Sequence, residues 1–65
     1  MSKLGNNIKH LRQTKNISQD RLSKLADVSP QTIIKIELDE KPNPKIETVQ
    51  KIAKALGVSI DNLMK

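Results

Sequence analysis

Gln31, Ile34 and Lys35 stand close together in the sequence and offer three different kinds of contact. The glutamine amide carries a donor and an acceptor, the lysine ammonium donates, and the isoleucine side chain is apolar. At about 100° per residue, these residues and Leu38 share one face of a helix. In the major groove of duplex DNA, Gln pairs with adenine, Lys reaches guanine or a phosphate, and an apolar side chain touches the thymine methyl group. We therefore predict that Gln31, Lys35 and Ile34 read bases.

The aliphatic residues on this face have a second interpretation. Ile34 and Leu38 could instead pack against the following loop, which contains Pro42 and Pro44, or against a partner subunit. In the strongest form of this alternative, the chain is a protein-interaction module of the antitoxin or coactivator type, and its basic charge is incidental. Salt-dependent binding to duplex DNA distinguishes the two interpretations.

Ser18 and Gln19 stand at the expected beginning of another helix. The free N–H groups and the positive end of the dipole at a helix N-terminus suit a phosphate. We predict that both residues contact the DNA backbone, although Ser18 could act as a helix cap alone. A further pair, Arg12 and Glu37, lies at the core edges of two helices, where an ion pair would have a structural role.

Five helices are expected to position these residues. Ser18, Ser29 and Ser59 are suited to cap helices, Pro30 suits a first helical position, and Gly57 favours a helix end. With these signals, the apolar spacing predicts helices over residues 2 or 3–15, 19–26, 30–38 and 46–56, and a short one after Ser59. The expected fold is all-α, a single domain over 1–65 with a central helix-turn-helix unit at about 19–38.

The apolar positions repeat at helical spacing and define one predicted core. These positions are Leu4, Ile8 and Leu11; Leu22, Leu25 and Ala26; Ile33 and Ile36; Val49, Ile52, Ala53 and Leu56; and Ile60, Leu63 and Met64.

Composition narrows the classes of function. The net charge of +5 favours a polyanionic partner, and the lack of aromatic residues favours duplex DNA over RNA loops and single strands. With no cysteine and one histidine, His10, we expect no disulfide, metal site or cofactor. No nucleophile–base pair or phosphate loop is evident, so we expect no catalytic residues, no enzyme activity and no small-molecule ligand. No membrane span or signal peptide is recognisable, which predicts a cytoplasmic protein without a membrane partner.

Several linked motifs resemble the lambda-repressor-like helix-turn-helix family of the Xre or Cro type. They lie at 17–22, 26–33, 36–37, 44–48 and 51–61, and the resemblance covers about Ile8 to Met64. It implies a compact five-helix fold and a transcription regulator, usually a repressor, that binds a near-palindromic operator as a homodimer. The apolar atoms of Val58, Ile60 and Met64 are the predicted pairing surface.

The same resemblance implies roles for individual residues. Gln19 would contact phosphate, Gln31 and Lys35 would read bases, and Arg12 would pair with Glu37. The remaining residues expected near the DNA backbone are Ser29, Thr32, Lys41, Asn43 and Lys45. The sequence departs from the family at Asp27, where Gly is usual, and at Leu38-Asp39-Glu40, where a polar residue, Gly and a base are common.

Overall fold

Serine caps determine where most of the helices begin. A computed structural model describes residues 2–65, and Ser2, Ser18, Ser29 and Ser59 each accept a backbone N–H bond at the start of a helix. The helices are α1 (Lys3–Thr14), α2 (Gln19–Ala26), α3 (Pro30–Leu38), α4 (Ile46–Leu56) and α5 (Ile60–Met64). The described residues contain no strand. The predicted boundaries are thus confirmed to within one residue.

Three residues in the left-handed backbone region make the sharp turns. Asn16, Asp27 and Gly57 have φ values of 58°, 57° and 71°. Asp27 ends α2 where glycine is usual, and its backbone N–H still donates to Lys24 O and Ser23 O. Aspartate tolerates this region better than most residues, so the substitution for glycine leaves the turn between α2 and α3 intact.

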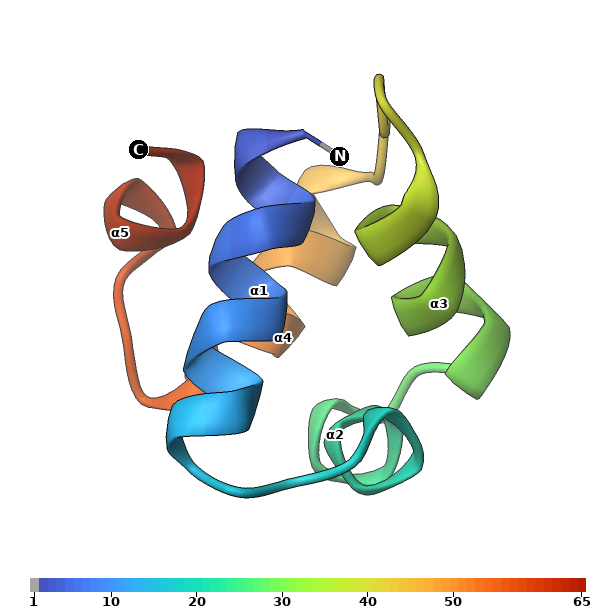
Figure 1. Cartoon of the computed structure of the whole chain (residues 1–65), viewed down its shortest axis with the longest axis vertical. Coiled ribbons are helices and arrows are strands. Elements are labelled where there is room, and N and C mark those ends of the chain that lie inside the picture. The colour runs from blue at the N-terminus through green and yellow to red at the C-terminus, as the bar shows by residue number, and fades with distance from the viewer. Residues whose placement is uncertain (1) are drawn as a thin grey trace.

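The helices surround one apolar core. Figure 1 shows α3 and α5 on opposite sides of α1, with α2 seen nearly end-on below α1 and α3. The most deeply buried side chains come from all five helices: Ile8, Leu22, Ile33, Ile52, Leu56 and Leu63. Because the core faces of α2 and α3 are fixed by these contacts, the opposite face of α3 is turned to solvent.

Two of the predicted core positions are wrong. Leu25 is 50% exposed and Met64 is 55% exposed. α2 is short and buries a narrow stripe formed by Leu22, Ser23 and Ala26, which leaves Leu25 outside. Met64 is the last residue of α5, where the single buried side chain is that of Leu63.

α1 and α3 approach each other at the level of their backbones. A Cβ atom added to Gly5 would lie 2.6 Å from the backbone oxygen of Ile36 and 3.1 Å from the Cα of Glu37. Any larger side chain at Gly5 would therefore push the two helices apart. The spacing between α1 and α3 is set by this backbone contact.

α5 is attached to α1 by a polar contact as well as by the core. Asn7 Nδ2 donates to the backbone oxygen of Leu63 at 2.8 Å.

Among residues 2–65, none of the helices has the length and apolar character required to cross a bilayer.

Candidate nucleic-acid interface

The exposed face of α3 carries the residues predicted to read bases. Gln31, Lys35 and Ile34 are all exposed, and Ile34 retains 38% of its accessible surface. The helix places Ile33 and Ile36 on the opposite face, in the core. Among residues 2–65, the bonds that α3 makes to other side chains come from Thr32 and Glu37. Gln31 and Lys35 make none. Their donors and acceptors are therefore available to a ligand.

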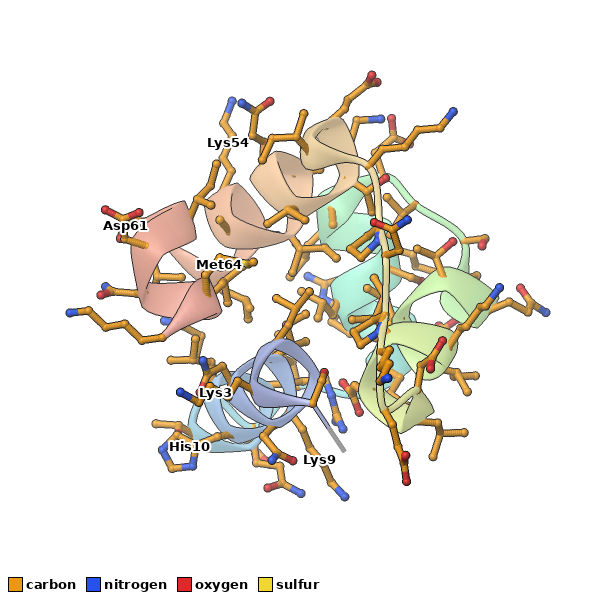
Figure 2. All side chains as sticks on the ribbon, turned by 90° about the horizontal axis from the view of Figure 1, so that it is seen from above. Lys3, Lys9, His10, Lys54, Asp61 and Met64 are labelled. Atoms are coloured by element: carbon orange, nitrogen blue, oxygen red, sulfur yellow. The ribbon has the colours of Figure 1, made fainter. Side chains whose placement is uncertain are left out.

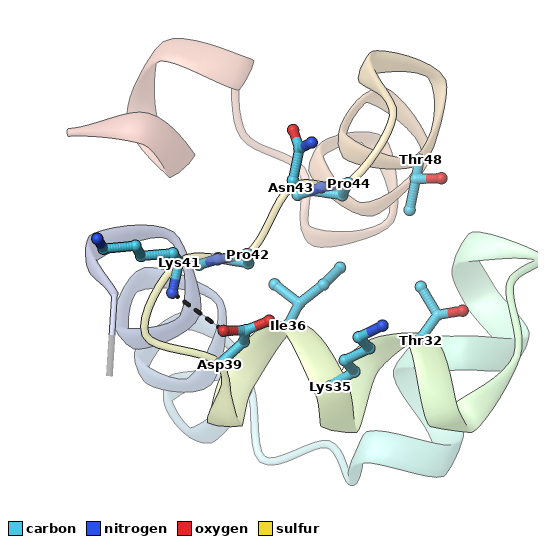
Figure 3. A pocket seen from close by; sticks show the side chains of 9 residues that line it. All are labelled: Thr32, Lys35, Ile36, Asp39, Lys41, Pro42, Asn43, Pro44 and Thr48. Carbon is cyan, nitrogen blue, oxygen red and sulfur yellow. Dashed lines mark hydrogen bonds between the residues drawn. The ribbon is translucent and has the colours of Figure 1, made fainter.

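A groove runs between α3 and the loop that follows it. Among its lining residues are Thr32 and Lys35 from α3, Lys41 and Asn43 from the loop, and Thr48 from α4. Figure 3 shows Lys35 and Thr32 pointing from α3 into the space below the loop, whereas the ammonium of Lys41 points away from α3. The structure thus brings four of the predicted DNA-contacting residues to one groove. Lys45 lies outside it, exposed at the start of α4.

An acidic residue, Asp39, also lines this groove together with Lys35 and Lys41. Asp39 Oδ1 accepts a bond from the backbone N–H of Lys41 at 3.0 Å, which tightens the turn after α3. Leu38, the last residue of α3, is 69% exposed, so it packs little against the loop. The departure from the family pattern at residues 38–40 therefore places an apolar and an acidic surface at this end of α3.

The Glu37 carboxylate connects three helices. Arg12 Nε from α1 donates to Oε2 at 3.0 Å, and Arg12 Nη2 donates to Oε1 at 3.1 Å. Gln19 Nε2, in the first residue of α2, donates to Oε1 at 3.0 Å. A bidentate arginine–carboxylate pair of this kind is stronger than a bond between neutral groups.

This group is buried and its polar atoms are satisfied. The Glu37 side chain is 3% exposed and that of Arg12 is 12% exposed. Arg12 Nη1 also donates to the backbone oxygen of Ile17 at 3.0 Å, in the connection between α1 and α2. Within residues 2–65, no buried side-chain nitrogen or oxygen lacks a partner. Arg12 and Glu37 therefore form the pair expected from the sequence, and Glu37 is more deeply buried than a core edge implies.

The bond from Gln19 to Glu37 was not predicted. It joins the residue expected to touch phosphate to the helix expected to read bases. No local pattern indicates it, because the two residues are 18 positions apart and belong to different helices. Its consequence is that the amide of Gln19 is held in place and keeps one N–H hydrogen free to donate elsewhere.

Two of the serines predicted to contact the DNA backbone, Ser18 and Ser29, have hydroxyl groups that already make bonds within the protein. Ser18 Oγ accepts from the backbone N–H of Arg21 at 3.0 Å. Ser29 Oγ accepts from the backbone N–H of Thr32 and lies 2.8 Å from Thr32 Oγ1. These bonds cap α2 and α3, and each exposed hydroxyl still has unused hydrogen-bonding capacity. His10 points outward from α1, away from these residues (Figure 2).

Together these features define a class of protein. Two short helices, α2 and α3, are joined by a tight turn, and the second presents a polar and apolar face to solvent beside a groove lined by Lys35 and Lys41. This is the arrangement of a helix-turn-helix domain. A family model described as helix-turn-helix matches residues 8–63, and the chain belongs to this family, of the lambda-repressor-like Xre type.

Similar sequences are regulators of transcription. The uncharacterized HTH-type transcriptional regulator RghRB of Bacillus subtilis is 34% identical over 64 residues, which cover 98% of this chain and 46% of the relative. An uncharacterized HTH-type transcriptional regulator of Methanocaldococcus jannaschii is 41% identical over 58 residues, which cover 89% of this chain and 86% of the relative. The chain thus spans about half the length of the Bacillus relative.

Similar solved structures confirm the fold. The N-terminal DNA-binding domain of SinR from Bacillus subtilis matches with a TM-score of 0.89 and 31% identity, over 95% of this chain and 90% of that one. The restriction-modification controller protein C.AhdI from Aeromonas hydrophila matches with a TM-score of 0.86 and 26% identity, over 94% of this chain and 91% of that one.

The Glu37 contacts predict a large coupling in stability. Glu37→Ala leaves the buried Arg12 without its carboxylate, and we expect the free energy of unfolding to fall by about 3–5 kcal/mol. Urea unfolding measures this change. The double variant Arg12→Met, Glu37→Leu should recover much of the loss, because neither charge then remains buried alone.

A matched control is Glu47→Ala, which removes an exposed carboxylate 3.9 Å from Lys51 and should change stability little. If Glu37→Ala does not fold, Glu37→Gln replaces it in the cycle, because this variant keeps an acceptor oxygen. Additive effects of the Arg12 and Glu37 substitutions would contradict the coupling.

Proposed function

We propose that this chain binds double-stranded DNA in a sequence-specific manner through α3 and regulates transcription. The observation that carries the proposal is the exposed face of α3, where Gln31 and Lys35 have no protein partner and Ile34 is left outside the core. A recognition helix places such side chains against base edges in the major groove. Family membership and the similarity to a DNA-binding domain support it.

The surrounding residues are proposed to contact phosphates. Gln19 is held by Glu37 with an N–H hydrogen to spare, and Ser18 lies beside it at the N-terminus of α2. The other proposed backbone contacts are Ser29 at the start of α3, Thr32, Lys41 and Asn43 in the groove between α3 and the loop, and Lys45 at the start of α4. Contacts from these elements would fix the orientation of α3 in the major groove, since phosphate contacts position a protein and base contacts specify its site.

The proposed role is that of a repressor acting at a near-palindromic operator, without enzyme activity. A repressor of this kind works where the chromosome is, which places the protein in the cytoplasm of a bacterium or of a phage-infected cell. The second candidate is a protein-interaction module, which is favoured by the 69% exposure of Leu38 next to Asp39 and Glu40. This alternative differs in predicting no salt-dependent binding to duplex DNA.

The dependence of affinity on salt tests the proposal. Each phosphate contact adds about −0.9 to the slope of log affinity against log salt, so 6–10 contacts reduce affinity roughly 10³–10⁵-fold between about 50 and 200 mM salt. We expect such a slope on duplex DNA in fluorescence anisotropy titrations. The duplex is chosen by selecting bound sequences from a random library. Affinity that is unchanged over this range would exclude the DNA-binding function.

Substitutions in the two kinds of contact should have different effects. Gln31→Ala removes a base contact, and should relax the preference at one base pair by about 1–3 kcal/mol. Lys41→Ala removes a phosphate contact, and should weaken binding to all sequences alike and reduce the salt slope by about 1. Titrations with the selected duplex and with random duplex measure both. Equal losses on the two duplexes for Gln31→Ala would contradict its role in base reading.

We also propose that two copies bind the operator together. The domain measures 23 × 22 × 21 Å, so one copy is too small to reach two half-sites about 34–36 Å apart. The proposed pairing surface contains Met64, which is exposed, and the half-buried Val58 and Ile60. No aromatic residue is present to anchor this surface, so the pairing is expected to be weak away from DNA.

Binding should therefore be cooperative on a palindromic duplex, with two chains per duplex. Met64→Glu should reduce this cooperativity, because it places a charge in the apolar surface. Leu25→Glu alters an equally exposed aliphatic position on α2 and should leave the cooperativity unchanged. Analytical ultracentrifugation of the complex gives the stoichiometry, and one chain on the selected operator with a footprint over a single half-site would refute the dimer.

A further inference from the structure

Ile34 is an apolar side chain in the middle of a hydrogen-bonding surface. On α3 it lies on the same side as Gln31 and Lys35, and 38% of its surface is exposed. It is not among the residues that line the groove beside the loop. More than a third of its surface is therefore open to solvent, and contact with a ligand would remove this apolar surface from water.

Base pairs offer one apolar group in the major groove. This is the methyl group on C5 of thymine, whereas cytosine carries only a hydrogen at C5 and the remaining edge groups are hydrogen-bond donors and acceptors. Methylation of cytosine at C5 places the same methyl group at the same position on a different base. A side chain that senses this group by apolar contact responds to the methyl and not to the identity of the pyrimidine.

We infer that Ile34 is a sensor of the pyrimidine C5 methyl group, so that 5-methylation of cytosine changes the affinity of this protein for its operator. The inference rests on the proposed binding of α3 in the major groove and goes beyond it, because it adds a chemical modification of the DNA as an input. Lys35, the adjacent residue, supplies a donor for a neighbouring guanine or phosphate.

Position along α3 distinguishes Ile34 from the other exposed aliphatic residue of this helix. A recognition helix contacts base edges with its N-terminal residues. Ile34 is the fifth residue of α3, whereas Leu38 is the last. Leu38 would therefore lie toward the edge of the DNA major groove, next to Asp39. It is an aliphatic residue on the same helix and serves as the control for Ile34.

The size of the effect follows from the area of one methyl group. Burying a methyl-sized group contributes about 0.8 kcal/mol, which corresponds to roughly a fourfold change in affinity. If two half-sites are bound together, the changes multiply to about 15-fold on a palindromic duplex. This range is well within the resolution of an anisotropy titration.

The experiment uses the selected operator duplex with single modified bases and the full 65-residue chain. Each thymine is replaced in turn by uracil, which lacks only the methyl group, and the sensitive position is then tested with cytosine and with 5-methylcytosine. We expect one position in each half-site at which uracil lowers affinity about fourfold and 5-methylcytosine binds about fourfold more tightly than cytosine. If that position carries cytosine in the selected operator, the second comparison alone reveals it.

Variants assign the effect to the side chain. Ile34→Ala should abolish the difference between methylated and unmethylated duplexes, Ile34→Val should keep part of it, and Leu38→Ala should leave it intact. A methyl effect that persists in Ile34→Ala would overturn the inference, as would the absence of any methyl effect in the parent chain. In the latter case, salt-dependent binding with sequence preference would still support the proposed function, whereas a loss of all such binding would contradict that function as well.

Discussion

The arrangement of the first three helices depends on one buried carboxylate. Glu37 is removed from water, and a charged group in that position is tolerated only when its oxygens are well bonded. Arg12 and Gln19 meet that requirement from α1 and α2, and Arg12 also binds the backbone of the connection between these helices. The contact supplies orientation more than net stability, because a buried pair gains little over a well-packed apolar group of the same size.

The Glu37 carboxylate also connects the buried ion pair to the residues proposed to contact DNA. Glu37 belongs to α3, and its bond to Gln19 fixes the start of α2 relative to the helix proposed to enter the groove. The spacing between the proposed phosphate contact and the proposed base contacts is therefore held by a bond within the protein. A binding surface that is ordered in advance loses less conformational entropy on binding.

Local sequence signals made the helices predictable, whereas features that depend on contacts between distant residues could not be predicted from the sequence. Serine caps and the turn residues Asn16 and Gly57 act within a few positions, so the helix boundaries could be read from the sequence. The exposure of Leu25 and Met64 could not, because the short helices α2 and α5 bury fewer residues than their apolar spacing implies. The Gln19–Glu37 bond and the groove between α3 and its loop depend on how helices meet, which no local pattern shows.

The backbone contact at Gly5 has a consequence for which residues of this chain can change. α3 is held by the close approach to α1, by Ile33 and Ile36 in the core, and by Glu37. Gln31, Ile34, Lys35 and Leu38 take no part in this support. Their side chains can therefore be exchanged at little cost in folding, and under the proposed function such exchanges would change the target sequence on an unchanged scaffold. The residues of the nine-residue helix α3 that support the fold and those proposed to carry specificity are different, so substitutions in one set need not disturb the other.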